Sequence, residues 1–204
     1  MDSISNTYVF MLCIFLLVLS VAADIIVLID SSNRMRQVNF KIALELAKII
    51  FIATGISRKG VHAGVVIYST RSQALCNLRN CRSVPVMARR VSKATFVGGR
   101  SGLPRALNRA NRLFKRSRRP QASQILVIIA AGKYRGNMMR PAKRMKSRGV
   151  TIFGMGIGTK YPKNLPKVCS GPPFFYAGLN LRKLNEVEIK DFISKLNNSK
   201  YYHH

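Results

Sequence analysis

The chain has 204 residues, in which 35 Lys and Arg stand against 7 Asp and Glu, giving a formal net charge of +28. This length suits one ordinary α/β domain and excludes a large multidomain arrangement within the sequence. A field this positive attracts polyanions whatever the fold, so we expect an acidic partner.

The first 23 residues have the pattern of a secretory signal peptide. Residues 8–21 are apolar but too few for a comfortable membrane span, and Val21, Ala22 and Ala23 suit a cleavage site. No Lys or Arg precedes the apolar stretch, so an uncleaved N-terminal anchor is the alternative. No other segment is long and apolar enough to span a bilayer. We expect cleavage after Ala23 and a secreted, extracellular product with a domain at 24–196 and a short tail at 197–204.

Apolar runs and amphipathic segments alternate along the remaining chain. Residues 23–30 form a mostly apolar run of the kind found in parallel strands buried on both faces. Further strands are expected at 61–68, 73–78, 124–131, 150–158 and 174–176, and 73–78 is expected to form an antiparallel edge. Helical spacing predicts helices at 38–56, 84–95, 103–114, 137–148 and 184–196.

The first strand runs into Asp30-Ser31-Ser32-Asn33-Arg34. This stretch resembles the opening of a von Willebrand factor type A domain, whose first strand leads into Asp-x-Ser-x-Ser, the start of a metal-ion-dependent adhesion site. The resemblance continues in order over about residues 24–196 and includes a Gly98-Gly99-Arg100-Ser101 loop similar to the Gly-Gly-x-Thr of the family. It implies a three-layer α/β fold with a mostly parallel six-stranded sheet flanked by helices. It also implies a binding or adhesion module.

The resemblance departs from the family at the metal site. Ser101 stands where the metal-contacting Thr belongs, but Arg34 replaces a Ser hydroxyl and Ala131 replaces the carboxylate of Thr-Asp-Gly. Magnesium requires near-octahedral oxygen ligation, usually with one or two carboxylates. We therefore expect no cofactor, magnesium included. Any residual metal binding would fall to Asp30, Ser32 and Ser101.

The same loops are rich in cations. We expect fixed guanidinium and ammonium groups to replace the metal and to hold an acidic ligand through charge-assisted hydrogen bonds, with Asp30 paired to Arg34. The predicted ligand-binding residues are Asp30, Ser32, Arg34, Arg36, Arg100, Ser101, Arg105, Lys133 and Arg135. The alternative is a uniformly basic surface with no privileged site, because cations at helical spacing also form a row at Arg105, Arg109, Arg112 and Arg116.

Three cysteines remain once the leader is removed. Cys76 and Cys81 would close a small loop, leaving Cys169 free or in an intermolecular bridge that makes a homodimer. The alternative is that all three are small apolar fillers. Their spacing matches no zinc pattern.

These patterns favour a secreted, non-enzymatic adhesion module that recognises acidic extracellular matrix, glycan or glycoprotein ligands. A nucleic-acid-binding protein and a cationic membrane-active protein are the alternatives. The leader, the absence of Trp and the lack of an aromatic-interleaved basic motif argue against nucleic acid. No enzyme is expected, because the few acids are dispersed and no Gly-x-Ser-x-Gly elbow surrounds a serine.

Overall fold

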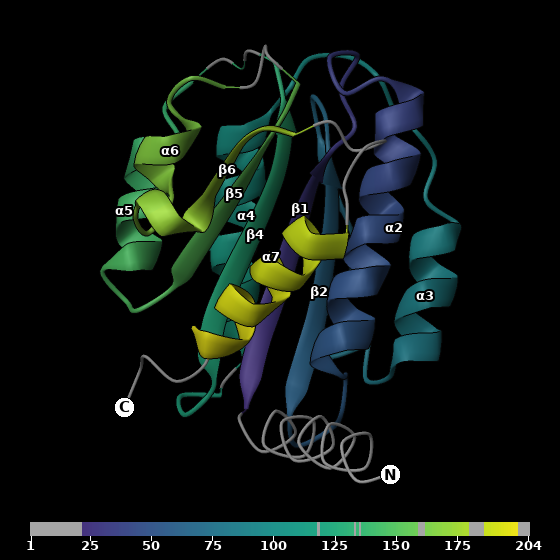
Figure 1. The fold of residues 1–204 in the computed structure, drawn as a ribbon, viewed down its shortest axis with the longest axis vertical. Coiled ribbons are helices and arrows are strands. Elements are labelled where there is room, and N and C mark those ends of the chain that lie inside the picture. The colour runs from purple at the N-terminus through teal and green to yellow at the C-terminus, as the bar shows by residue number, and fades with distance from the viewer. Residues whose placement is uncertain are drawn as a thin grey trace, which may run out of the picture.

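The computed structural model describes residues 22–117, 119–132, 134, 136–158, 162–179 and 186–199. A six-stranded sheet forms its middle layer in the order β3-β2-β1-β4-β5-β6 (Figure 1). The strands are β1 (Ala23–Asp30), β2 (Val61–Tyr68), β3 (Ser72–Cys76), β4 (Ser123–Ala131), β5 (Thr151–Ile157) and β6 (Phe175–Leu179). Every neighbouring pair is parallel except β2 with β3. The predicted mostly parallel six-stranded α/β fold is therefore confirmed.

Strand β1 lies at the centre because it can be buried on both faces. Ile25, Val27 and Ile29 point into one core, whereas Ile26 and Leu28 point into the other. Such side chains on alternating faces are what a strand covered by helices on both sides requires.

Helices cover both faces of the sheet (Figure 1). One layer contains α2 (Gln37–Thr54), α3 (Val84–Ser92) and α7 (Glu186–Asn198), and the other contains α4 (Leu103–Ser117), α5 (Met139–Lys146) and α6 (Leu165–Val168). All five predicted helices are present, with ends shifted by a few residues. Helix α6 and a 3-10 helix (Pro172–Phe174) were not predicted, because segments of three or four residues carry no periodicity to read.

The start of the domain bears on the predicted leader. Ala23 is the first residue of β1, buried in register with Val61 on β2 and Ser123 on β4. Residues 1–21 lie outside the described residues, so cleavage after Ala23 stays a prediction. Across the part of the chain that is described, no helix has the length and apolar character needed to cross a membrane.

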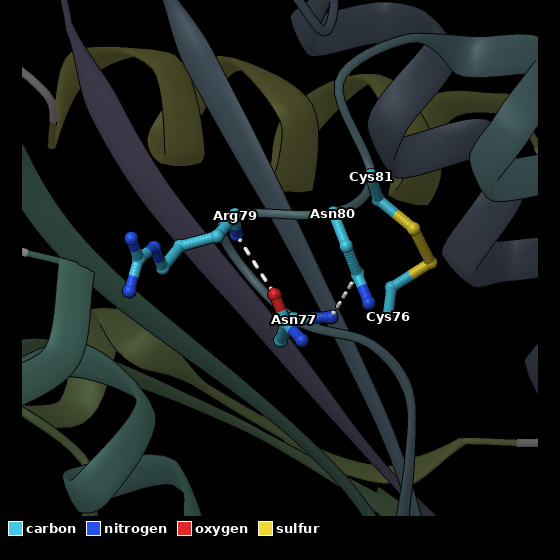
Figure 2. The surroundings of a disulfide bond; sticks show 5 residues. All are labelled: Cys76, Asn77, Arg79, Asn80 and Cys81. Atoms are coloured by element: carbon cyan, nitrogen blue, oxygen red, sulfur yellow. Dashed lines mark hydrogen bonds between the residues drawn. A yellow bond between two sulfur atoms is a disulfide. The ribbon is translucent and has the colours of Figure 1, made fainter.

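Cys76 and Cys81 form a disulfide across the loop that follows β3 (Figure 2), as predicted. Cys169 is free but only 3% exposed, and its Sγ donates to the Leu165 carbonyl over 3.3 Å. Burial raises the pKa of this thiol to about 12. Of the two alternatives for Cys169, the structure favours the free thiol, because the folded chain holds it away from solvent.

Candidate functional site

Asp30 lies at the carboxyl end of β1 and is fully buried. Its Oδ1 accepts a hydrogen bond from the Ser32 amide at 2.8 Å, and its Oδ2 accepts from the Ala131 amide at 3.2 Å and from Ser101 Oγ at 3.4 Å. Burial raises the pKa of this carboxyl to about 6, and the hydrogen bonds oppose that rise. Asp30 thus ties the β1 loop to the loop before α4 and to the end of β4.

Further contacts draw these loops into one edge of the sheet. Ser31 Oγ accepts from the Val97 amide at 2.8 Å, and Asn33 Oδ1 accepts from the Gly99 amide at 2.9 Å. Ser101 forms an isolated parallel bridge with Tyr134. The three loops that the sequence placed together do therefore meet, because the carboxyl ends of neighbouring parallel strands share one edge.

Arg34 is positioned by Gly132 rather than by Asp30. Gly132 has a φ of +70°, and a Cβ built there would lie 2.6 Å from the Arg34 Cβ, so only glycine leaves room for this side chain. Among the described residues no ion pair joins Arg34 to Asp30. That predicted pair is wrong, because the Asp30 carboxylate is buried and satisfied by three other donors while Arg34 is exposed.

The other predicted cations divide into two groups. Arg36 and Arg100 are exposed, and Arg36 has a φ of 61° and a ψ of 150°, which side-chain-bearing residues rarely adopt. Arg105 is exposed but its Nη1 donates to the Thr70 carbonyl over 3.2 Å, so it also braces the turn after β2. Lys133 and Arg135 lie outside the described residues.

The turn after β2 also contributes to this edge, although no sequence pattern predicted it. Thr70 Oγ1 accepts from the Arg100 amide at 3.3 Å, which places this turn beside the predicted loops. Its position directly after Tyr68, at the end of a strand adjacent to β1, was the signal that could have identified it.

The oxygen donors that the described residues bring to this edge fit magnesium poorly. Asp30 is the one carboxylate that the described residues bring to it, and both of its oxygens already accept hydrogen bonds. Ser32 Oγ is buried and has no hydrogen-bond partner among the described residues, and Ser101 donates to Asp30. Nowhere in the described chain do three or more His, Cys, Asp or Glu side chains gather as they would around a metal. A single protonatable carboxyl with two hydroxyls is a poor match for a hard divalent cation.

The fold and this edge define an α/β domain with a loop-built site at the carboxyl ends of its central strands. Residues 24–195 match the von Willebrand factor type A domain. The chain belongs to the von Willebrand factor type A family, as the resemblance implied.

Named relatives and a solved structure agree with this assignment. Human von Willebrand factor A domain-containing protein 2 is 29% identical over 145 residues, which cover 71% of this chain and 19% of that protein. The mouse collagen alpha-4(VI) chain is 25% identical over 176 residues, covering 85% of this chain and 8% of that one. A structure of proximal thread matrix protein 1 from the mussel byssus, with a zinc-occupied metal-ion-dependent adhesion site, superposes with a TM-score of 0.76 at 19% identity. That alignment covers 86% of this chain and 46% of the mussel chain. The chain thus spans only a small part of the length of these two curated relatives.

Proposed function

We propose that this chain is a secreted, non-enzymatic adhesion module that binds an acidic extracellular polymer or glycoprotein at the carboxyl edge of its sheet without a metal ion. The ligand is an acidic group that meets exposed guanidinium groups directly. Arg34, Arg36 and Arg100 are the residues assigned to hold it, with the buried Asp30 and Ser101 organising the loops beneath them.

The observation that carries the proposal is that Arg34, a cation, stands where the family has a metal-binding hydroxyl, and Ala131 stands where it has a carboxylate, while the surrounding loops still meet. Arg34 stands at the third position of the adhesion motif, against the glycine that follows Ala131. An arginine side chain there offers a planar fork of donors that suits carboxylate and sulfate groups. In this proposal the guanidinium of Arg34 binds the acidic group of the ligand, as the metal ion would in other members of the family.

The relatives support the class of partner. They include collagen VI chains and matrilin-2, and the similar mussel protein is a thread matrix protein. The net charge of +28 selects acidic members among such partners and speeds their encounter with the domain. An extracellular setting also agrees with the leader predicted at residues 1–23 and with the Cys76–Cys81 disulfide.

The test is binding of the chain to an immobilised sulfated polysaccharide, measured over increasing salt with magnesium and again with EDTA. We expect tight binding that falls steeply with salt and does not respond to EDTA. Arg34→Ser restores the family's hydroxyl and removes one charge-assisted contact. It should weaken binding by about 10-fold, the equivalent of losing one such hydrogen bond.

Lys93→Ser is the matched control, because it removes one positive charge from an exposed residue just after α3. It should change binding far less than Arg34→Ser does. Binding that requires magnesium would overturn the metal-free site, and failure to bind at low salt would overturn the polyanion partner as well.

A further inference from the structure

The two helix layers differ sharply in charge. No Asp or Glu occurs in the sequence between Glu45 and Glu186, and the whole of α4, α5 and α6 lies in that interval. Among side chains that the structure describes, the exposed acids are Glu45 on α2 and Asp191 on α7, both in the opposite layer. The α4 layer therefore presents cations without neighbouring carboxylates to neutralise them.

The arginine row on α4 divides into two halves with different roles. In the first half, Arg105 donates to the Thr70 carbonyl and Arg109 Nη1 donates to the Ser72 carbonyl over 3.0 Å. These two side chains brace the turn between β2 and β3. In the second half, Arg112 and Arg116 are exposed, and neither guanidinium donates a hydrogen bond to any described residue.

Two hollows flank the second half of α4. One, of about 190 Å³, is lined by Arg116 and Leu113 of α4 and by Asn77, Leu78 and Arg79 of the disulfide loop. The other, of about 560 Å³, lies at the end of α4 and has Lys115 and Arg148 in its lining. Arg119 also lines it, but Asp24 neutralises that side chain through a 2.8 Å contact. Lys115 and Arg116 are neighbours in sequence on a helix, so they project to different sides and reach one hollow each.

Arg79 lines the first hollow and belongs to the disulfide loop. The Arg79 amide donates to Asn77 Oδ1 at 3.0 Å (Figure 2). The Arg79 carbonyl accepts from Arg82 Nε at 2.9 Å. The Cys76–Cys81 bond closes this turn, and Leu78 packs beneath it into the core. The backbone that carries Arg79 is thus fixed from both ends.

We propose that the outer surface of α4 is a binding track for a linear sulfated polysaccharide, separate from the sheet edge. The track runs from Arg79 across Arg116, Arg112 and Lys115 to Arg148, with a hollow on each side of the helix. This inference rests on the proposed function only for the chemical class of the partner. A linear polyanion can meet the row of cations in succession, which a compact acidic group at the sheet edge cannot do.

A sulfated chain fits this surface better than a nucleic acid does. Proteins that bind single-stranded nucleic acid add aromatic platforms on which bases stack. The exposed large hydrophobic residues of the described chain include no aromatic residue; they are Val38, Ile49, Ile52, Val97 and Met139. Contacts made by charge alone suit sulfate groups on a sugar chain.

The experiment compares two double variants that lower the net charge equally. Arg112→Ser with Arg116→Ser alters the track, whereas Arg89→Ser with Lys93→Ser alters exposed residues in and just after α3 in the opposite layer. Affinity for heparin oligosaccharides is measured by titration over a range of salt. The track variant should lose at least about 10-fold in affinity, and its salt slope should fall by about two. The α3 variant should lose less than about 3-fold.

Three outcomes would overturn the track. The first is an equal loss of heparin affinity in both double variants, and the second is a wild-type chain that binds heparin while the track variant binds it equally well. The third is tighter binding of single-stranded DNA than of heparin at matched salt. A wild-type chain that binds neither polyanion would overturn the proposed function together with the track. Because all four substituted side chains are exposed, we expect unchanged unfolding curves, which would show that losses in binding are not losses of fold.

Discussion

The sheet edge around Asp30 and the α4 track are both basic, but they are built in different ways. At the edge, a buried carboxylate gathers loops from three parts of the chain, and the cations stand on a framework of specific hydrogen bonds. On α4, Arg112 and Arg116 project from a regular helix whose opposite side packs into the core. The edge is therefore sensitive to local geometry, whereas the track depends on charge and spacing along one element. Substitutions can separate these two kinds of site.

The largest expected effect concerns Asp30, which belongs to the edge alone. Because its pKa is raised to about 6 in the folded chain, the folded state binds a proton more tightly than the unfolded state does. The carboxyl therefore favours folding below about pH 4, and that advantage is lost as the pH rises through about 6. The free energy of unfolding should fall by roughly 2.5 kcal/mol from this group between pH 4 and pH 7.

Urea unfolding of the wild type and of Asp30→Asn across this range checks that prediction. Asp30→Asn should lack most of the fall, because the amide does not titrate. The variant Arg112→Ser with Arg116→Ser should keep the wild-type profile. The same slope in wild type and Asp30→Asn would show that another group sets the pH dependence.

The second prediction concerns the disulfide loop, which carries Arg79 at one end of the track. Replacing Cys76 and Cys81 by Ser opens a loop of five-residue separation, which should cost about 2 kcal/mol of unfolding free energy. It should also weaken heparin binding, since the turn that carries Arg79 is no longer closed. The loss should be smaller than in the Arg112→Ser with Arg116→Ser variant, because those two cations remain. Chemical denaturation and heparin titration measure the two effects.

Cys169→Ser provides the control for these cysteine changes. It leaves the loop disulfide intact and lies on the segment that follows α6. Its heparin affinity should equal that of the wild type. If the double cysteine variant binds heparin as tightly as Cys169→Ser does, Arg79 is not part of the track.

The smallest expected effect concerns the strained backbone at the edge. Arg36→Gly should raise the free energy of unfolding by about 1 kcal/mol, because glycine accepts the observed φ of 61° without a side-chain clash. Its binding to the polysaccharide should fall nonetheless, since a cation at the edge is lost. Arg34→Gly is the comparison. Arg34 has no left-handed φ for glycine to relieve, so this variant should lose stability. Thermal unfolding measures the stability of both variants, and the polysaccharide titration measures their binding. A loss of stability in Arg36→Gly would show that the backbone at Arg36 is not strained.

The strands and long helices could be predicted because their signals are local. The mostly apolar residues 23–30 permit burial on two faces, and the apolar spacing on α2 and α4 fixes which helix face meets the sheet. The adhesion motif at Asp30 and the Gly98–Ser101 loop could be read from order and identity, and parallel strands brought them together as expected. The pairing of Cys76 with Cys81 followed from their short spacing.

Contacts between distant side chains decided the rest. Residue identity and periodicity were enough to predict the positions of the strands, the family resemblance and the net charge of +28. They were not enough to show that Arg34 packs against Gly132 instead of pairing with Asp30, or that Cys169 is buried, because both depend on which distant residues the fold brings together. The same holds for the row of arginines on α4. Arg105 and Arg109 donate to backbone carbonyls, whereas Arg112 and Arg116 donate to no described residue, because the fold places the turn after β2 within reach of the first two only.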